Sequence, residues 1–312
     1  MNFTSLLNTI ASLALLMAVG YFLRRVGLID DAFSKGLSSL IVKVGQPMLI
    51  ISSLISLEYS AENLRRGLIA LALSFCLHVV MGTVAHFALC RMKNVDERKI
   101  FEFTVMFTNC GFIGFPIIES LYGKEGLFCG AFYLVGFHLF IWTWGMAILS
   151  RGRDDIKLTP KKIFVNYGTI PSLIGFLLFL LPFPLPNFLT TTANYLGGLS
   201  TPISLLITGS LIATGGLRRL FGDKKLYAVA ALRLIVLPAL VCCLLKLCGL
   251  SEFLIVFGTV MAAMPSASVI TMLGELYGID PACASRAVGL TSVLCVVTLP
   301  LAVAFAQMIT AI

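Results

Sequence analysis

Apolar runs, each about 20 residues long, follow one another along almost the whole chain, and they constrain the fold more than any other feature. A helix of that length matches the hydrocarbon core of a bilayer. Only 12% of the residues are charged and 58% are hydrophobic, whereas ordinary soluble domains have about 25% charged residues. The chain is therefore predicted to be an all-α integral membrane protein without a soluble domain.

The runs predict ten transmembrane helices joined by short loops. Their approximate ranges are 4–23, 36–56, 67–90, 102–122, 127–149, 164–183, 195–216, 226–248, 253–275 and 285–310. No Lys or Arg precedes the first run, which therefore lacks the basic region of a cleaved signal peptide and is predicted to remain as the first span.

The basic residues predict the orientation, because cytoplasmic loops are enriched in Lys and Arg. If the N-terminus lies outside, the inside loops hold 17 of the 23 Lys and Arg residues and the outside loops hold four. Both termini are therefore predicted to lie outside. The net charge of +8 follows from these loops, so it does not indicate a nucleic-acid partner.

An internal repeat appears at an offset of 155 residues. It relates Gly20 to Gly175, Pro47 to Pro202, and the LYG at 121–123 to the LYG at 276–278. The repeating unit contains five helices, and an odd number inverts the second copy. We expect two inverted five-helix repeats, 1–150 and 164–312, joined by a short cytoplasmic loop at 151–163. Inverted repeats are typical of secondary transporters.

The fourth predicted span is interrupted. Between Thr104 and Gly123 it contains Asn109, two glycines and Pro116, and proline removes a backbone donor from a helix. Unwound backbone at membrane depth is tolerated only inside protein or beside a water-filled cavity. The stretch therefore predicts a broken helix that holds a polar solute. A simple proline kink, with Asn109 bonded to a neighbouring helix, explains it equally well.

The ninth predicted span is interrupted at the corresponding place, by Pro265 followed by Ser266 and Ser268. Two broken helices that cross at the midplane would direct their half-helix N-termini to a common point. Such ends carry a partial positive charge and free N–H groups, which suit an anion such as a carboxylate.

Other polar residues inside the spans are further candidates. Glu119 is predicted to couple transport to protons, or else to form a salt bridge or lie at a wet helix end. Arg233 and Lys43 either serve the solute site or reach to the membrane surface, and Arg233 has the further option of an acidic partner. Polar residues of span six, Asn166, Thr169 and Ser172, are predicted to line the path or to bond neighbouring helices. The three histidines have no zinc-binding spacing.

These motifs resemble the auxin efflux carrier family, which includes the plant PIN auxin exporters and bacterial malate or malonate permeases. The matching residues of spans four and eight are Asn109, Gly114, Pro116, Arg233 and Pro238. Those in and after span nine are Ala263, Pro265, Glu275, Tyr277 and Pro281, and those of span six are Asn166, Thr169, Ser172 and Gly175. Tyr167 replaces a proline of the plant pattern, and Ile50 replaces a serine, which argues against auxin as the natural substrate.

The resemblance implies a fold similar to that of bile-acid symporters, with a scaffold of helices one, two, six and seven and a transport domain of the other six. It implies an elevator-type carrier in the plasma membrane, the inner membrane in bacteria, and it allows a homodimer. It also implies a small organic anion, a mono- or dicarboxylate, bound where helices four and nine cross. The substrate-binding residues are then predicted to be Asn109, Cys110, Gly111, Pro116, Met264, Pro265, Ser266, Ser268, Gln46, Pro47, Thr201 and Pro202.

Three other functions remain open at this point. The chain has no HExxH, paired aspartate or GxSxG motif, which argues against a membrane-embedded enzyme. A ligand sensor built on a transporter fold is an alternative, and so is a cation-coupled symporter of another solute class. No cofactor is expected, and coupling to H⁺ or Na⁺ is left undecided.

Overall fold

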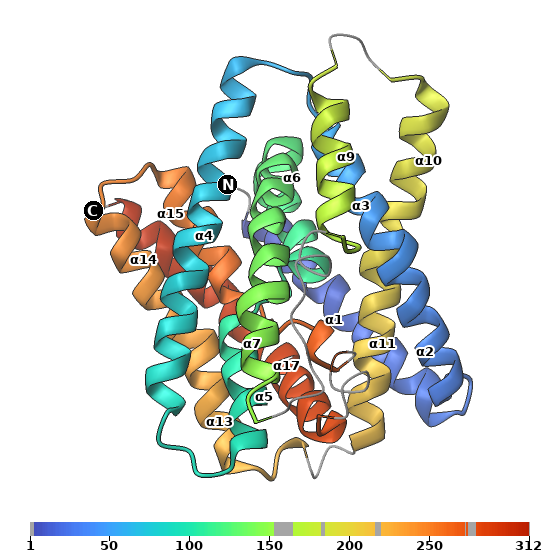
Figure 1. Ribbon diagram of the computed structural model, residues 1–312, viewed down its shortest axis with the longest axis vertical. Coiled ribbons are helices and arrows are strands. Elements are labelled where there is room, and N and C mark those ends of the chain that lie inside the picture. The colour runs from blue at the N-terminus through green and yellow to red at the C-terminus, as the bar shows by residue number, and fades with distance from the viewer. Residues whose placement is uncertain are drawn as a thin grey trace.

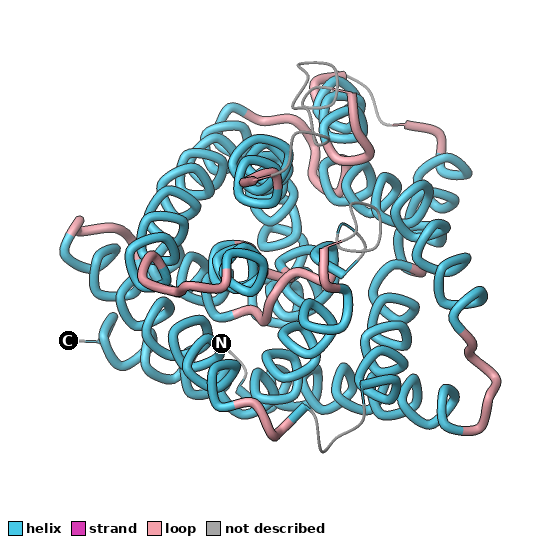
Figure 2. The backbone as a smooth tube through the Cα atoms, turned by 60° about the horizontal axis from the view of Figure 1, so that its bottom comes forward, coloured by secondary structure: helices cyan, strands magenta, loops and turns pink. Residues whose placement is uncertain are grey.

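The computed structural model describes residues 3–152, 165–181, 185–215, 220–271, 273 and 279–311. Regular structure in these residues is helical, apart from an isolated antiparallel bridge between Thr108 and Ser266. Figure 2 shows the helices as a bundle joined by short loops. The LYG at 276–278, Glu275 and most of the loop 151–163 lie outside the described residues.

The helices are labelled in Figure 1, and four short π-helical segments (η) continue or begin some of them. In the first half they are α1 (Phe3–Arg25), α2 (Asp31–Leu40), η1 (Ile41–Gly45), α3 (Gln46–Leu54), α4 (Ala61–Leu89), α5 (Val95–Met106), η2 (Cys110–Gly114), α6 (Phe115–Phe140), η3 (Ile141–Gly145) and α7 (Met146–Leu149). In the second half they are α9 (Thr169–Phe179), α10 (Asn187–Gly198), α11 (Ser200–Gly215), α13 (Lys224–Ala231), η4 (Leu232–Val236), α14 (Leu237–Leu247), α15 (Glu252–Ala263) and α17 (Pro281–Ala311).

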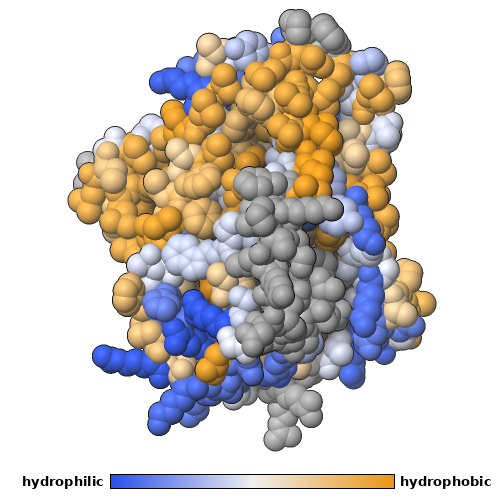
Figure 3. Space-filling model, in the orientation of Figure 1, coloured by the Kyte–Doolittle hydropathy of each residue, from blue (hydrophilic) through white to orange (hydrophobic). Residues whose placement is uncertain are grey.

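The described residues form 7 helices that are long and apolar enough to cross a membrane. Two further apolar helices, α9 and α15, are shorter. Hydrophobic residues cover the upper part of the face in Figure 3, and hydrophilic residues gather at its lower end. A multi-pass membrane protein is therefore confirmed.

Several helices begin earlier than their apolar runs because a polar side chain caps the first turn. Asn94 accepts hydrogen bonds from the amides of Asp96 and Glu97, so α5 begins at Val95 instead of residue 102. Asp280 does the same for α17 by accepting from the amides of Ala282 and Cys283. N-terminal caps of this kind are strongly preferred positions for Asn and Asp. The charged first turns thus extend beyond the apolar runs.

Three of the π-helical segments end directly before a helix that carries proline at its second residue. These are η1 before Pro47, η2 before Pro116 and η4 before Pro238. Proline has no N–H and cannot complete the usual α-helical bond, so the preceding turn widens locally. All three prolines therefore shape a helix without ending it, and the interruption before η2 lies at residues 107–109.

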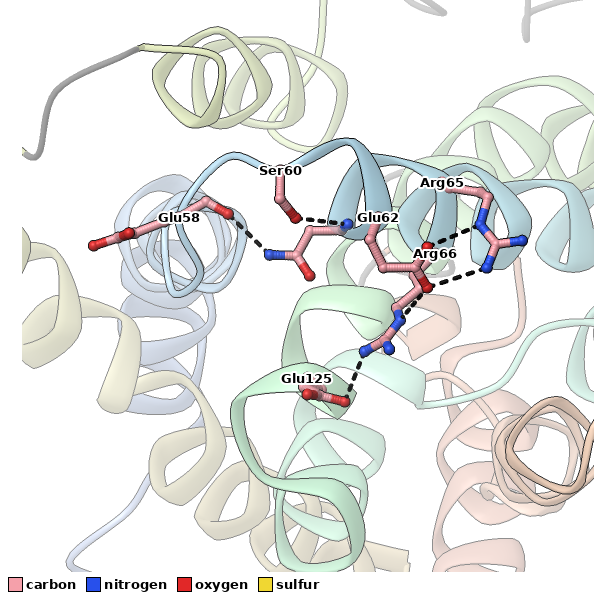
Figure 4. Close-up of polar contacts among 7 residues, drawn as sticks. Glu58, Ser60, Glu62, Arg65, Arg66 and Glu125 are labelled. Carbon is pink, nitrogen blue, oxygen red and sulfur yellow. Dashed lines mark hydrogen bonds and ion pairs between the residues drawn. The ribbon is translucent and has the colours of Figure 1, made fainter.

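The long helix α6 changes direction at Gly123, whose φ of 59° lies in the left-handed region that glycine adopts readily. Next to this point, Arg66 of α4 pairs with Glu125 at 3.0 Å and with Glu62 at 3.0 Å (Figure 4). Arg65 also pairs with Glu62 at 3.1 Å. These exposed pairs connect α4 to the second part of α6.

Two close helix contacts are related to each other by the 155-residue offset of the repeat. In α1, a Cβ added at Gly20 would lie 2.1 Å from the backbone oxygen of Leu206 in α11. In α9, a Cβ added at Gly175 would lie 3.2 Å from the Cα of Ile51 in α3. Gly175 and Leu206 follow Gly20 and Ile51, respectively, by the same 155 residues that the repeat predicts. The two halves therefore pack their first helix onto the other half's second helix in the same way.

A buried carboxylate joins three elements at the lower end. Glu102 of α5 is 1% exposed and accepts from Arg98 at 2.6 Å and from Arg151, just after α7. His86 of α4 lies 3.8 Å from the same carboxylate. Since a buried charge is stable only when paired, this cluster holds α4, α5 and α7 together.

Gly209→Ala should destabilise the protein, because the new Cβ would lie 1.9 Å from the backbone oxygen of Met17. We expect unfolding free energy to fall by about 3 kcal/mol, at the upper end of overpacking costs. Thermal unfolding in detergent measures it. Gly36→Ala is the control, since nothing lies within 4 Å of its added Cβ. Equal melting temperatures for the two variants would contradict the close contact of α1 and α11.

Glu102→Gln should leave two arginines facing a neutral amide and lower the free energy of unfolding by about 3 kcal/mol. Glu97→Gln removes a carboxylate from the same helix, but that carboxylate pairs with the exposed Lys225. We expect it to cost less than about 1 kcal/mol. Melting curves of both variants provide the comparison, and a larger loss in Glu97→Gln would disprove the central role of Glu102.

Candidate functional site

The two interrupted helices cross, and their unwound backbones pair at the crossing. α5 ends at Met106 and α15 ends at Ala263. The Asn109 amide donates to the Pro265 oxygen at 2.8 Å, and the Ala267 amide donates to the Phe107 oxygen at 3.0 Å. The intervening Ser266 amide donates to the Thr291 hydroxyl of α17 at 3.2 Å. We call residues 107–109 and 264–268 the crossover.

The side chain of Asn109 connects the two helices that leave the crossover. Its oxygen accepts from the Phe112 amide at 3.3 Å and caps η2, while its Nδ2 donates to the Ser268 hydroxyl at 3.1 Å. Ser268 immediately precedes residues 269–271, which are again helical. Two helix N-termini thus meet at the contact between Asn109 and Ser268. Helix N-termini attract anions through free N–H groups and the helix dipole.

A cavity with a volume of about 950 Å³ borders this contact. Its described lining includes Ser38, Gln46, Thr108, Asn109, Gly111, Phe112, Phe137, His138, Trp142, Tyr167, Gly168, Ser204, Ile207, Leu211, Ser268 and Thr271. None of the described lining residues is Asp, Glu, Lys or Arg. We call this space the first cavity. Its walls combine neutral hydrogen-bonding groups with large apolar and aromatic surfaces.

A second cavity, of about 1450 Å³, lies toward the other end of the same helices. The first cavity touches residues 38–46 of α2, η1 and α3, whereas the second touches residues 49–56. Among the predicted site residues, Pro116, Glu119 and Thr201 line the second cavity. Glu119 is exposed there, and Lys124 lines the same cavity. The crossover therefore borders the first cavity, and none of its residues lines the second.

Several predicted substrate-binding residues lie in the crossover or directly after it but line neither cavity. Cys110, Met264 and Ser266 are completely buried, and Pro265 is buried with them. Pro47 and Pro202 lie near the starts of α3 and α11 and also line neither cavity. Their role in this structure is to shape the helices that form the walls.

Arg233 lies beside the crossover and is fully buried. It does not extend to the membrane surface, and none of the described acidic residues pairs with it. Its Nη2 donates to the Met264 oxygen at 3.0 Å, at the C-terminal end of α15, and its Nη1 lies 3.6 Å from the Met81 sulfur. Within the described residues, a backbone carbonyl takes the place that the predicted internal pair gives to an acid.

The remaining candidates lie away from the Asn109–Ser268 contact. Lys43 is exposed on η1 and lines neither cavity. The side-chain oxygen of Asn166 accepts from the amides of Gly168 and Thr169 before α9, and Ser172 donates to the Gly168 oxygen. These bonds shape the start of α9 and place Gly168 in the wall of the first cavity.

The sequence reasoning missed His138 as a cavity residue. Its Nε2 lies 3.1 Å from the Gln46 side-chain nitrogen, which joins α6 to α3. A Cβ added at Gly168 would lie 2.1 Å from the imidazole ring, so glycine is required there. A histidine within an apolar run was the available signal. His78, in contrast, is fully buried, donates from Nδ1 to the Ser74 backbone oxygen at 2.7 Å and stacks on Phe140.

A metal centre finds no support in the described residues, which contain no group of three or more His, Cys, Asp or Glu side chains able to hold an ion. All nine cysteines are free. The crossover therefore offers neutral donors, two helix N-termini and one buried guanidinium. Such groups bind a solute and do not by themselves make or break a covalent bond.

Residues 5–303 match the model of the family described as membrane transport protein. The chain belongs to this family. The resemblance to the auxin efflux carriers is thereby confirmed at the level of the family. An uncharacterized transporter of Methanothermobacter thermautotrophicus is 27% identical over 96% of this chain and 98% of its own length. An uncharacterized transporter of Methanocaldococcus jannaschii is 24% identical over 88% of this chain and 90% of its own.

Thiol labelling tests which face of the crossover the cavity reaches. In a background without the nine native cysteines, Ser268→Cys should react with a small methanethiosulfonate reagent, because Ser268 lines the first cavity. Ser266→Cys should stay unreactive under the same conditions, because Ser266 is 0% exposed. Mass spectrometry measures the adducts. Faster labelling at position 266 than at 268 would contradict the geometry of the crossover.

Proposed function

We propose that the protein is a secondary transporter for a small organic anion, whose carboxylate binds at Asn109 and Ser268. The observation that carries the proposal is the meeting of two helix N-termini at this contact, on the wall of a cavity. A carboxylate there would accept hydrogen bonds from the Asn109 amide nitrogen and from the Ser268 hydroxyl. The rest of the solute would lie against the apolar and aromatic walls.

The walls favour a carboxylate attached to an organic body over a small inorganic ion. Phe112, Phe137 and Trp142 provide apolar area, while Gln46 and His138 provide a second polar contact. Ligand sites commonly combine a mainly apolar lining with a few placed polar groups. Malate, malonate and auxin-like acids are the mono- and dicarboxylates to consider first. Because none of the described lining residues is Lys or Arg, the first cavity favours a solute with a low negative charge.

The proposed topology has ten spans. The 40-residue segment Cys110–Leu149 reverses at Gly123 and would cross the membrane as parts of two spans. Together with the segment that follows the crossover, α5 and α15 would complete spans four and nine. The basic residues then place both termini outside in a plasma membrane.

An elevator-type movement fits the contacts between the two groups of helices. The proposed scaffold is α1, α2–α3, α9 and α10–α11, and the proposed transport domain contains the other helices. Side-chain hydrogen bonds between described residues of the two groups include the following three. They are Gln46 with His138 at 3.1 Å, Thr208 with Ser268 at 3.5 Å, and Ser285 with the Leu211 oxygen at 3.5 Å. The ion pairs of Glu102 and Arg66 lie within the proposed transport domain, so it would move as one body.

The repeat supports alternating access from opposite sides. The second-cavity residues Leu49, Ser52, Ser56 and Pro116 are followed 155 residues later by the first-cavity residues Ser204, Ile207, Leu211 and Thr271. Conversely, Val42 and Gln46 of the first cavity correspond to Gly197 and Thr201 of the second. The two cavities therefore have equivalent walls in the two repeats. Glu119, exposed in the second cavity, is the residue through which protons would be coupled.

Asn109→Ala should abolish saturable carboxylate binding without unfolding the protein, because it removes the amide at the meeting point of the two helices. The measurement is the increase in melting temperature produced by malate, malonate, phenylacetate and indole acetate. A ligand that raises the melting temperature of the wild type should not raise that of Asn109→Ala. This result corresponds to at least a tenfold loss of affinity, equivalent to about 1.4 kcal/mol.

Asn194→Ala is the matched control, because Asn194 lines the second cavity instead of the first. It should keep the ligand-induced shift. An unchanged shift in Asn109→Ala would disprove the site, and no shift by any carboxylate in the wild type, together with no uptake into proteoliposomes, would disprove the proposed function.

A further inference from the structure

Arg233 is a buried charge without a counter-ion in the described part of the chain. Its side chain is 0% exposed, and an arginine stays protonated inside proteins. One carbonyl and one sulfur are its partners, and its Nε has none. The ion pairs that the described Asp and Glu residues form with Lys or Arg involve residues other than Arg233. A buried charge is normally paired, so this arrangement requires an explanation.

The charge contacts the crossover next to the residue that pairs with the Asn109 backbone. Arg233 donates to the oxygen of Met264, and the next residue, Pro265, accepts from the Asn109 amide at 2.8 Å. Among the described residues, the ionisable side chains in electrostatic range of Arg233 are Tyr133, Cys110, Cys295 and His78. All four are neutral or cationic at neutral pH when unperturbed, except for a small thiolate fraction. None of them supplies a full negative charge to the crossover.

Arg233 belongs to the body that would move. It lies on η4, which packs against α15 and α17, and its guanidinium contacts Met81 of α4 as well as the crossover. Glu119 does not balance it locally, since that carboxylate is exposed in the second cavity, which Lys124 also lines. With an empty site, the described interior of the moving body therefore carries one positive charge beside the crossover.

We propose that Arg233 sets the charge of the transported solute at a single negative charge. A monocarboxylate at Asn109 would neutralise the moving body, a dicarboxylate would leave it with one negative charge, and an empty site leaves it with one positive charge. Moving an uncompensated charge through a medium of low dielectric constant is costly. This inference rests on the proposed function, because it assumes a carboxylate at Asn109 and movement of the helices that carry Arg233.

Two properties of transport follow from this charge balance. The loaded body is neutral, so exchange of solute for solute should not respond to membrane potential. The empty body is charged, so net uptake, which includes its return, should be slower than exchange and should depend on the potential. An elementary charge that crosses the entire field gains or loses about 2.3 kcal/mol per 100 mV, which limits the effect to about 50-fold.

The first test uses the wild-type protein in proteoliposomes with phenylmalonate and its monomethyl ester as probes. The two compounds share one aromatic body and differ by one charge. We expect the monoester to enter at least about tenfold faster. Potentials set with potassium and valinomycin should change net uptake of the monoester about three- to tenfold per 100 mV and leave its exchange unchanged, within the limit given by one charge.

The second test changes the charge. In Arg233→Gln the loaded body would carry one negative charge and the empty body none, so the voltage dependence should appear in exchange. Arg233→Lys keeps the charge and should behave like the wild type. Lys43→Gln removes an exposed positive charge distant from the crossover and should change neither property. A purely structural role of Arg233 would reduce all rates without transferring the voltage dependence.

The outcomes separate the two proposals. Equal uptake of phenylmalonate and its monoester, or voltage-dependent exchange in the wild type, would overturn the role of Arg233 and leave carboxylate transport intact. If Arg233→Gln does not fold, the wild-type and Arg233→Lys measurements still decide. Absence of uptake for these probes and for malate, malonate and indole acetate would disprove the proposed function, and the inference would fall with it.

Discussion

Unwound backbone inside a membrane protein needs hydrogen-bond partners, and the rest of this structure depends on how that need is met. The two interrupted helices provide backbone hydrogen-bond partners for each other. The Asn109 amide donates to the Pro265 oxygen, and the Ala267 amide donates to the Phe107 oxygen. Each unsatisfied backbone group would otherwise cost several kcal/mol in the absence of water. The pairing fixes the crossing point, and the crossing point places two helix N-termini and the Asn109 side chain at one wall of a cavity. In the proposed function, solute recognition is thus a consequence of the pairing that satisfies the unwound backbone.

Strong and weak contacts are distributed unequally around this point. The buried Glu102 cluster and the Arg233 contact with Met264 connect helices of the proposed transport domain to one another. Contacts between that group and the proposed scaffold consist mainly of apolar surfaces, with a few long hydrogen bonds such as Thr208 to Ser268. Within the scaffold, Gly20 and Gly209 allow α1 and α11 to approach closely. Two firm bodies with an apolar boundary can slide at lower cost than two bodies joined by ion pairs.

The sequence predicts the membrane class, the broken helices and the offset of the repeat, because these depend on composition, proline and simple spacing. Asn109 and Ser268, which lie on the two interrupted spans, are hydrogen-bonded to each other in the structure. Partners that depend on three-dimensional packing are beyond such reasoning: the carbonyl that binds Arg233 belongs to a helix end 31 residues away. The contact of His138 with Gln46 depends equally on the packing of α6 against α3. Helix starts differ from prediction because capping by Asn94 and Asp280 extends helices beyond their apolar runs.

The proposed inverted repeat would also explain how one sequence can serve two access states. A single structure shows both cavities, and their walls are exchanged by the offset of 155 residues: Gln46 lines the first cavity and Thr201 the second. Gly45 and Ser200 are related by the same offset and contact each other, since a Cβ on Gly45 would lie 2.7 Å from the Ser200 hydroxyl oxygen. A residue that contacts its own repeat equivalent must lie near the pseudo-twofold axis. If the two halves exchanged conformations about that axis, these central contacts would be retained while the cavities exchanged sides, so access could alternate without rebuilding the crossover.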